Sequence, residues 1–355
     1  MSGPLRLLVV GCGHVFRRFH LPALRHAEGI EVAGVADRDP VAARAAADAL
    51  GGVPAFAEAE ELLTAVPAAA ALVLTPPDAH APVIDRALAR GLHLLVEKPL
   101  ATEVVAAERL AAVARARGLW LQVGYNRRLR PSLRALAGAL GEGGSGPRRL
   151  RLRLRTPGSR WGRAGGDEGA VARELLFDLG THLADLAAWL AASPVVAVRA
   201  KPLRLAGGGP ELAAEFRLAD GSRAYCTVGY GRRLEEHAIA QGPDGLLVAT
   251  PWTFHRGGWT AGTGLRDRLR RLADLGSARL GLTRNLTQRS FDAQLAGFRE
   301  AVAGRPRPEL ADARAAVAAV RTVEAWRRSL AAAGDWCDAH RDDASSREAA
   351  CPLSS

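Results

Sequence analysis

Lysine, cysteine and aromatic side chains are scarce in this chain of 355 residues. The four cysteines lie far apart, without the short spacings of metal ligands, which argues against a disulfide framework and a zinc site; they are Cys12, Cys226, Cys337 and Cys351. Aromatic residues make up only 5% of the chain, so a nucleic-acid-binding protein of this composition would have few side chains on which bases could stack. We therefore expect no bound metal and no nucleic-acid partner.

Long apolar runs are also missing. Arg, Asp or Glu interrupts every Ala/Leu stretch before it reaches the roughly 18 residues that a membrane-spanning helix requires. The first residues, Met1-Ser2-Gly3-Pro4, lack the basic and apolar regions of a signal peptide. We expect a cytoplasmic chain with no membrane partner. Its composition, 48% hydrophobic and 24% charged, is that of a globular protein large enough for two packed cores.

The positive charge of the chain comes almost entirely from arginine. Basic residues number 48 against 37 acidic ones, a net charge of +11, and only Lys98 and Lys201 are lysines. Abundant Arg, Ala, Gly and Pro are typical of GC-rich genomes, so we interpret the excess as a solvated surface; a face that binds polyanions is the alternative. A lysine kept in this background indicates a need for a compact, titratable ammonium, although Lys201 illustrates chance retention.

Two regions differ in their hydrophobic pattern. In the first, continuous apolar runs are separated by Ala-rich helical stretches, which predicts a parallel sheet covered on both faces; the runs are 5–10, 30–36, 71–75, 92–96 and 119–123, and the helices 41–50, 82–91 and 102–118. In the second, residues 149–155 alternate Arg and Leu, which predicts a strand with one exposed face. Further strands are expected at 195–206, 211–218, 222–230 and 237–249, a helix near 178–191, and helical spacing over 291–330.

These patterns predict the fold class and its boundaries. We expect an α/β protein with a doubly wound parallel sheet over residues 1–125. An α+β domain with an open, mainly antiparallel sheet should follow over 126–330, with its C-terminal helix packing back on the first domain. Residues 331–355 are expected to form a flexible tail.

A glycine motif follows the first expected strand and opens a helix, as in a dinucleotide-binding fingerprint. It reads Gly11-Cys12-Gly13-His14-Val15-Phe16. Gly11 would allow a tight turn, and Gly13 would let the backbone approach a pyrophosphate. Phe16 stands where Gly or Ala is usual and alters the packing of helix on strand. An ordinary strand-to-helix turn is the alternative.

An acid stands where such a site contacts the adenosine ribose. Asp37 ends the second expected strand, close to the roughly 20-residue separation of such fingerprints. Its carboxylate would repel a 2′-phosphate and so favours NAD, whereas the neighbouring Arg38 could grip a 2′-phosphate and keeps NADP open. The alternative is that Asp37 and Asp39 are turn residues before Pro40.

Two polar motifs fall at the ends of the next strands, where open α/β sheets bind their ligands. They are Thr75-Pro76-Pro77-Asp78-Ala79-His80 and Glu97-Lys98-Pro99. Farther along, Asp178, His182 and Asp185 share one helical face. An acid one turn from a histidine can orient it for proton transfer; a helix-start Asp beside a half-buried structural His is the alternative.

Together these motifs resemble those of the Gfo/Idh/MocA oxidoreductases over nearly the whole chain. The matching residues are Gly11-Cys12-Gly13 with His20 and Pro22, Thr75-Pro76-Pro77-Asp78 with His80, Glu97-Lys98-Pro99, Gly124-Tyr125-Asn126-Arg127-Arg128, and Asp178-Leu179-Gly180-Thr181-His182 with Asp185. The resemblance implies a Rossmann domain, a C-terminal substrate-binding and oligomerisation domain, and a nicotinamide cofactor, NAD or NADP, at their junction.

The resemblance also implies site roles. Lys98 would hydrogen-bond the reacting hydroxyl, His182 would be the general acid/base, and Asp178 its partner or a second substrate contact. Cofactor contacts are expected from Gly11, Gly13, Val15, Phe16, Asp37, Arg38, Thr75, Pro76, His80, Glu97 and Lys98. Substrate contacts are expected from Tyr125, Arg127 and Trp161; a structural arginine and a core aromatic are the alternatives for Arg127 and Trp161.

The function implied is hydride transfer between NAD(P) and a hydroxyl/keto carbon of a sugar, cyclitol or sugar-like intermediate. Alternatives are imine reduction, redox-assisted elimination, and a non-catalytic cofactor-binding regulator. Where the family has a glycine-rich stretch, this chain has Ala172-Arg173-Glu174, which predicts either a pocket reshaped for a charged substrate or an Arg173–Glu174 pair on a solvated turn. A homodimer or homotetramer through the open sheet is expected, with Glu211 and Glu215 interleaving the arginines of 149–155.

Overall fold

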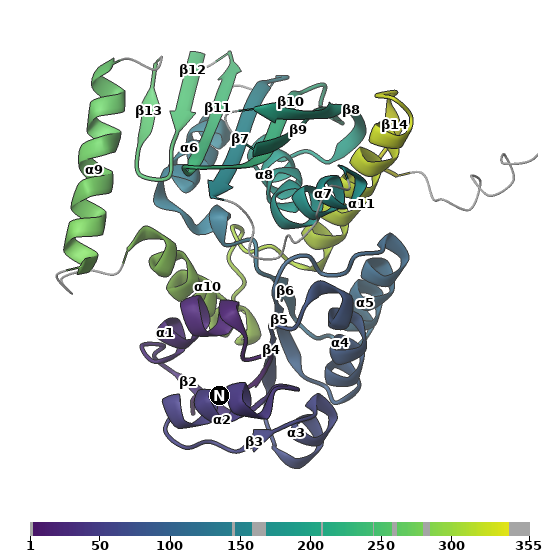
Figure 1. Ribbon diagram of the computed structural model, residues 1–355, viewed down its shortest axis with the longest axis vertical. Coiled ribbons are helices and arrows are strands. Elements are labelled where there is room, and N and C mark those ends of the chain that lie inside the picture. Colours follow the sequence, from purple (N-terminus) through teal and green to yellow (C-terminus); the bar gives the residue numbers. More distant parts are fainter. Residues whose placement is uncertain are drawn as a thin grey trace, which may run out of the picture.

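The computed structural model describes residues 3–143, 146–157, 168–206, 209–243, 245–257, 261–279 and 285–340. Figure 1 shows two sheets, one in each half of the molecule, with helices between and around them. Within the described residues, no helix is both long enough and apolar enough to cross a bilayer.

The first half is a six-stranded parallel sheet in the order β3-β2-β1-β4-β5-β6. Its strands are β1 (Leu5–Val10), β2 (Ile30–Ala36), β3 (Ala55–Phe56), β4 (Ala70–Val73), β5 (His93–Val96) and β6 (Leu121–Val123). The strand residues are largely buried because helices cover both faces. The predicted parallel sheet is therefore confirmed.

Helices connect these strands, and local signals set their ends. They are α1 (Leu21–Leu24), α2 (Pro40–Ala49), α3 (Ala59–Ala65), α4 (His80–Ala89) and α5 (Val104–Ala116), with shorter turns η1 (Phe16–His20), η2 (Pro77–Ala79) and η3 (Asn126–Leu129). The Asp39 carboxylate caps α2 by accepting the Val41 N–H. Gly91 and Gly118 follow α4 and α5 with φ of +75° and +64°, the left-handed conformation that ends helices.

The second half is an eight-stranded mixed sheet in the order β13-β12-β11-β7-β10-β9-β8-β14. Its strands are β7 (Arg149–Pro157), β8 (Val195–Ala206), β9 (Gly209–Leu218), β10 (Arg223–Gly231), β11 (Glu235–Gly242), β12 (Gly245–Ala249), β13 (Phe254–Arg256) and β14 (Cys337–Asp338). Among the strands that the structure describes in this sheet, only β7 and β10 pair in parallel. The mainly antiparallel sheet is thus as predicted.

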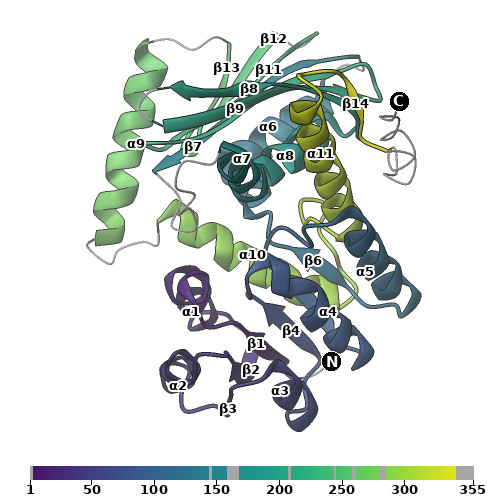
Figure 2. The same cartoon turned by 45° about the vertical axis from the view of Figure 1, so that its right-hand side comes forward.

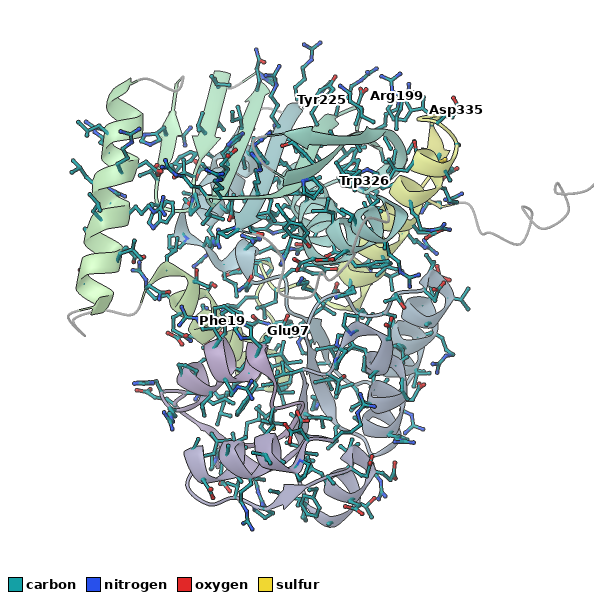
Figure 3. All side chains as sticks on the ribbon, viewed as in Figure 1. Phe19, Glu97, Arg199, Tyr225, Trp326 and Asp335 are labelled. Carbon is teal, nitrogen blue, oxygen red and sulfur yellow. The ribbon has the colours of Figure 1, made fainter. Side chains whose placement is uncertain are left out.

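One face of this sheet carries a helix layer. It consists of α6 (Pro131–Glu142), α7 (Glu168–Leu175), the π-helical turn η4 (Leu176–Gly180), α8 (Thr181–Ala191) and α11 (Ala313–Ala331); Figure 2 shows these helices beneath the strands. Trp326 of α11 is fully buried, with its ring edge-on to Phe216 of β9 at 5.4 Å (Figure 3). Arg149 and Arg151 alternate with buried leucines on β7 and face away from this layer. That face is open, as expected.

Two other helices lie outside this layer. Helix α10 (Leu286–Val302) returns to the first sheet, where Phe291, Leu295 and Phe298 pack into the core around β1. Helix α9 (Ala261–Arg279) stands beside β13 at the edge of the second sheet (Figure 1). The sequence analysis made no prediction for residues 261–279, and the leucines of α9 are exposed rather than part of a core.

Two expectations about the second half were wrong in detail. The single strand expected at 237–249 is the hairpin β11–β12, because Gly245 adopts φ of +85° and reverses the chain. The expected tail does not begin at 331. Trp336 lies under the guanidinium groups of Arg199 and Arg217, 4.9 and 3.7 Å from its ring centre, and residues 337–338 then pair with β8. Residues 341–355 lie outside the described residues.

Candidate active site

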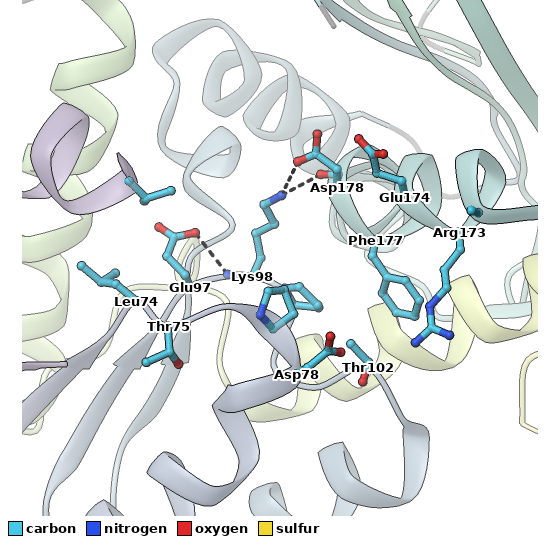
Figure 4. Close-up of a pocket in the computed structure, with 14 residues that line it drawn as sticks. Leu74, Thr75, Asp78, Glu97, Lys98, Thr102, Arg173, Glu174, Phe177 and Asp178 are labelled. Atoms are coloured by element: carbon cyan, nitrogen blue, oxygen red, sulfur yellow. Dashed lines mark hydrogen bonds and ion pairs between the residues drawn. The ribbon is translucent and has the colours of Figure 1, made fainter. Parts of the chain in front are cut away.

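A cavity of about 590 Å³ lies where the carboxyl ends of the first sheet face α7 and η4 of the second domain. From the first domain it is lined by Val15, Leu74, Thr75, Pro77, Asp78, Glu97, Lys98, Pro99 and Thr102, and from the second by Ala170, Arg173, Glu174, Phe177 and Asp178. Figure 4 shows Lys98 crossing between the two sets toward Asp178. The cavity thus joins two motifs that are 80 residues apart in sequence.

The Lys98 ammonium is fixed by the second domain. Its Nζ donates to the Asp178 carboxylate Oδ1 and to the Asp178 carbonyl oxygen, both at 2.8 Å. The side chain keeps 18% of its surface exposed. An ammonium has three N–H donors, so one donor is left for a molecule in the cavity.

Asp178 is held between a lysine and a tyrosine. Its Oδ1 accepts from Lys98, and its Oδ2 accepts from the Tyr230 hydroxyl of β10 at 3.2 Å. Burial by itself would raise the pKa of Asp178, but the Lys98 charge and both hydrogen bonds outweigh it and lower the pKa below its usual value. Asp178 is therefore a carboxylate at neutral pH. The sequence carried no signal for Tyr230, which lies far along the chain on a strand of ordinary pattern.

His182 does not pair with Asp178, although both were predicted to share a helical face. The π-helical turn η4 ends at Gly180, between them, and changes the 3.6-residue spacing on which that prediction depended. The His182 side chain is buried, its Nδ1 has no hydrogen-bond partner, and its ring meets Tyr125 edge-on at 5.9 Å. Burial, reinforced by the nearby Arg127 and Lys98 charges, lowers the pKa of His182 well below its usual value. The imidazole is therefore neutral at pH 7.

The Glu97 side chain anchors the Glu-Lys-Pro loop that carries Lys98. The carboxylate of Glu97 contacts His20 Nε2 at 2.9 Å and accepts the Lys98 backbone N–H at 3.2 Å. Burial would raise the pKa of Glu97, but the hydrogen bond from His20 and the Lys98 charge lower it. Gly124 leaves room for this carboxylate, because a Cβ there would come within 3.1 Å of it.

His80 also supports this loop, and it does not line the cavity. Its two ring nitrogens lie 2.8 Å from the carbonyl oxygens of Pro99 and Thr75. The ring is almost completely buried, and burial lowers its pKa despite the two carbonyls. His80 therefore ties the end of β4 to the Glu-Lys-Pro loop. We had expected it among the cofactor contacts.

A second cleft, of about 910 Å³, runs along the glycine turn and the end of β2. Gly11, Gly13, Val15, Asp37, Arg38, Thr75 and Pro76 line it. Asp37 accepts the backbone N–H of Cys12 at 2.6 Å with Oδ2 and that of Asp39 at 2.9 Å with Oδ1, which fixes the carboxylate beside the turn. Seven of the predicted cofactor contacts thus share one groove, and Val15 and Thr75 also line the first cavity.

The two glycines of the turn have different surroundings. Gly11 has φ of +100°, and a Cβ there would lie 2.7 Å from the Leu74 backbone. At Gly13 a Cβ would meet nothing within 4 Å, so the fold itself does not require that glycine. The open space beside Gly13 is where backbone could approach a pyrophosphate, and these residues therefore fit a dinucleotide.

Phe16 and Tyr125 are corrections. Phe16 is fully buried in the core around β1 and lines neither cleft; its large ring takes the place of a small residue, and η1 widens there into a π-helical turn. Tyr125 is buried against His182 and lines neither cleft. Burial raises the pKa of Tyr125, which keeps its hydroxyl protonated. Trp161 lies outside the described residues.

Arg127 belongs to a buried ionic cluster behind the cavity. Its Nη1 donates to Glu236 at 2.5 Å, and Arg130 donates to the other oxygen of the same carboxylate. The Nε atoms of both arginines are buried without a partner. Nearby, Arg128 binds Asp185 through two hydrogen bonds of 2.8 and 2.5 Å. Asp185 is thereby committed to Arg128 and does not orient His182.

Arg173 and Glu174 lie on helix α7 and not on a solvated turn. Both line the cavity, and the structure gives no ion pair between them. The Arg173 guanidinium lies 5.7 Å from the Phe177 ring centre, and Glu174 Oε1 is buried without a partner. The interpretation as a mutually paired turn was wrong. The reshaped-pocket alternative remains.

A comparison with protein families matches residues 5–125 to the Gfo/Idh/MocA model, described as an oxidoreductase family with an NAD-binding Rossmann fold. The match covers about a third of the chain and shows that residues 5–125 are similar to the NAD-binding domain of that family. The matched segment contains the glycine turn, Asp37 and the Glu-Lys-Pro loop.

Curated relatives match part of the chain. A dTDP-3,4-didehydro-2,6-dideoxy-alpha-D-glucose 3-reductase from Actinomadura kijaniata is 39% identical over 142 residues, covering 40% of this chain and 42% of the relative. An inositol 2-dehydrogenase from Corynebacterium glutamicum is 32% identical over 205 residues, covering 57% and 58%. The chain thus spans only about two fifths to three fifths of these relatives' lengths.

Solved structures match the fold over nearly its full length. The myo-inositol dehydrogenase from Lactobacillus casei, determined in complex with NAD(H) and myo-inositol, has a TM-score of 0.75 at 20% identity and covers 94% of this chain and 96% of that chain. The WlbA dehydrogenase from Bordetella pertussis, in complex with NADH and UDP-GlcNAcA, has a TM-score of 0.76 at 20% identity, covering 96% and 99%. At this identity the likeness establishes the two-domain fold.

Proposed function

We propose that the protein is an NAD(P)-dependent oxidoreductase that moves a hydride between nicotinamide and a hydroxyl/keto carbon of a sugar, cyclitol or sugar-like intermediate. One observation carries the proposal. The Lys98 ammonium is held by Asp178 in a cavity that shares Val15 and Thr75 with the dinucleotide-sized groove. A proton donor and a groove for the cofactor therefore meet at one place.

The groove residues have separable tasks in this proposal. The open space at Gly13 would give a pyrophosphate access to backbone N–H groups, and Asp37, in the same groove, would accept hydrogen bonds from the ribose hydroxyls. Asp37 favours NAD, while Arg38 in the same groove leaves NADP possible. The nicotinamide, when bound, supplies or receives the hydride.

The protein's part in the chemistry is to manage the hydroxyl proton. A carbinol carbon cannot lose a hydride to give a ketone unless its hydroxyl proton also departs. Lys98 would donate its remaining N–H to that oxygen and stabilise negative charge on it, with Asp178 positioning the ammonium. His182 is buried, neutral at pH 7 and not among the residues that line the cavity; its assignment as the proton acceptor rests on the resemblance of the Asp178-to-His182 motif to the family's.

The position of the Arg173 guanidinium favours a substrate with an anionic group. This guanidinium lines the cavity without a carboxylate partner in the described residues. A substrate with an anionic group would neutralise it, and the sugar substrate named for the Actinomadura kijaniata relative carries a nucleoside diphosphate. We therefore propose that sugars linked to a nucleoside diphosphate be tested beside free sugars and cyclitols.

The first test is cofactor binding. NAD or NADP should raise the melting temperature, because a ligand that binds only the folded state stabilises it. A panel of free sugars, cyclitols and nucleotide sugars is then followed at the absorbance of reduced nicotinamide. The absence of a thermal shift with both cofactors would contradict the proposal. A thermal shift without turnover of any substrate class would favour a cofactor-binding regulator.

The second test removes the proton chemistry. Lys98→Ala and His182→Ala should each lower turnover about 100-fold or more, the usual scale of general acid–base catalysis, while the NAD-induced thermal shift persists. Lys201→Ala is the matched control, because it removes the other lysine of the chain from an exposed position on β8 and should retain turnover. Unchanged turnover in Lys98→Ala or His182→Ala would refute that residue's role.

A further inference from the structure

Helix α9 carries a row of leucines that nothing in the described part of the chain covers. Leu265, Leu269 and Leu272 are 58%, 57% and 65% exposed, and Leu275 is 43% exposed. The other large apolar side chains exposed in the described residues, Val41, Val105 and Tyr225, lie singly on other elements. Four exposed leucines on one helix are thus a concentrated feature of this surface.

The opposite side of α9 fastens the helix to the protein. Asp267 Oδ1 accepts hydrogen bonds from the hydroxyls of Thr250 and Thr253. Asp274 accepts the Leu286 backbone N–H at 3.0 Å and an N–H of Arg289 at 2.8 Å. Both carboxylates of α9 therefore face inward and are occupied. At 3.6 residues per turn, the row of Leu265, Leu269 and Leu272 lies on the far side from them.

Arginines border the leucine row on both sides. Arg268 lies along one side, and Arg266 and Arg270 lie along the other. All three are exposed, and the structure gives them no ion pair within the described residues. Arg271, by contrast, turns back over the Trp252 ring at 5.4 Å. The outward face thus combines exposed leucines with exposed arginines and carries no carboxylate.

We propose that this face of α9 docks an acidic amphipathic helix of another protein. The four- and three-residue spacings of Leu265, Leu269 and Leu272 form the seam of a helix pair, and the arginines fall where such a partner places its flanking charges. A second copy would bring arginine against arginine. A lipid surface favours an apolar face with aromatic residues, whereas α9 has no aromatic residue.

The test uses two synthetic helical peptides and the full-length protein. Both peptides have three heptads with leucine at the a and d positions; one has glutamate at e and g, the other lysine. Fluorescence anisotropy should give saturable binding of the glutamate peptide, at least about tenfold tighter than the lysine peptide. Binding should weaken as salt rises. R266E/R268E should reverse the preference, and Leu269→Gln should weaken binding of both peptides.

A matched control makes the result specific. R115E/R314E reverses the same charge at exposed positions of α5 and α11 and should leave glutamate-peptide binding unchanged. Equal binding of both peptides, no binding of the glutamate peptide, or equal loss in the control would overturn the proposal. Tighter binding to vesicles of anionic and zwitterionic lipid than to the peptide would also overturn it. So would a dimer, seen by light scattering, that Leu269→Gln dissociates.

Discussion

At the scale of single residues, the glycine turn separates folding from binding. The close approach of Gly11 to the Leu74 backbone and its positive φ make that glycine part of the fold, whereas the space around Gly13 is open to the cleft. The same residue type therefore has two different physical requirements within three positions. The motif predicted different roles for the two glycines, and their surroundings supply a physical reason for each.

This difference predicts opposite phenotypes. Gly11→Ala should lower the melting temperature clearly, because its Cβ meets backbone that cannot move aside and its φ disfavours a side chain. Gly13→Ala should fold with nearly wild-type stability but bind NAD at least about tenfold more weakly, since its methyl group occupies the phosphate approach. Calorimetry and cofactor titration of both variants check this. Equal loss of stability in both would contradict the assignment.

Tyr230 is the second prediction at this scale. Tyr230→Phe removes the hydrogen bond to Asp178 Oδ2, worth about 1 kcal/mol or roughly a fivefold loss of turnover. Because that bond helps to lower the pKa of Asp178, its loss should raise that pKa and move the acid limb of the pH–rate profile to higher pH. Tyr225→Phe, at an exposed position of the same strand, should leave the profile in place. An unmoved acid limb in Tyr230→Phe would show that Asp178 does not control it.

At the scale of elements, strands and strand-end motifs could be predicted far better than side-chain partners. Continuous apolar runs located β1 and β2 to the residue, because burial on both faces leaves a strong local signal. The pairing of Lys98 with Asp178 could not be predicted, because it depends on the π-helical turn η4. The hydrophobic periodicity of the sequence does not indicate such a turn. Tyr230 and Glu236 lie on strands that pair with β7, which is distant in sequence. Their positions near the site therefore could not be predicted from the local sequence.

The ion pair between η3 and α8 supplies a prediction about elements. Arg128 and Asp185 are both buried and joined by two hydrogen bonds. Asp185→Asn leaves a buried guanidinium without its counter-charge and should lower the free energy of unfolding by about 3–5 kcal/mol. Denaturant unfolding measures this loss. The control Asp85→Asn breaks the doubly hydrogen-bonded but exposed pair with Arg109, where a much smaller loss is expected. Similar losses would mean that burial does not decide the effect.

At the scale of the whole molecule, buried histidines set the response to acid. Burial lowers the folded-state pKa of both His80 and His182. The unfolded chain therefore takes up protons at these positions below about pH 6.5, while the folded chain does not. Stability should fall as pH drops from about 6.5, by about 1.4 kcal/mol per pH unit for each such group.

A second loss should follow at lower pH. The pKa values of Glu97, Asp178 and Glu236 are lowered in the folded protein, so their stabilisation is present above their unfolded values and disappears as pH falls below about 4.5. Melting temperatures measured from pH 7.5 to pH 4 should show both declines. A melting temperature that stays constant between pH 7.5 and 5.5 would contradict the assignment of neutral histidines.

The open face of the second sheet is the expected site of self-association. Arg153 pairs with Glu211 and Glu235, and Glu215 pairs with Arg199 and Arg223. Arginines and carboxylates thus interleave on that face within one chain, which lowers the repulsion that the arginine strand alone would create. A homodimer or homotetramer remains a prediction.

The return of α10 to the first sheet has a consequence for protein engineering. Phe291, Leu295 and Phe298 belong to the core around β1, so residues 1–125 without α10 would expose to water the apolar surface that α10 covers. Residues 1–125 have the sequence pattern of an independent domain, but expressed alone they would expose an apolar surface and would tend to aggregate. A soluble cofactor-binding unit would need α10 spliced back onto it, for example by a short linker that bypasses the second sheet.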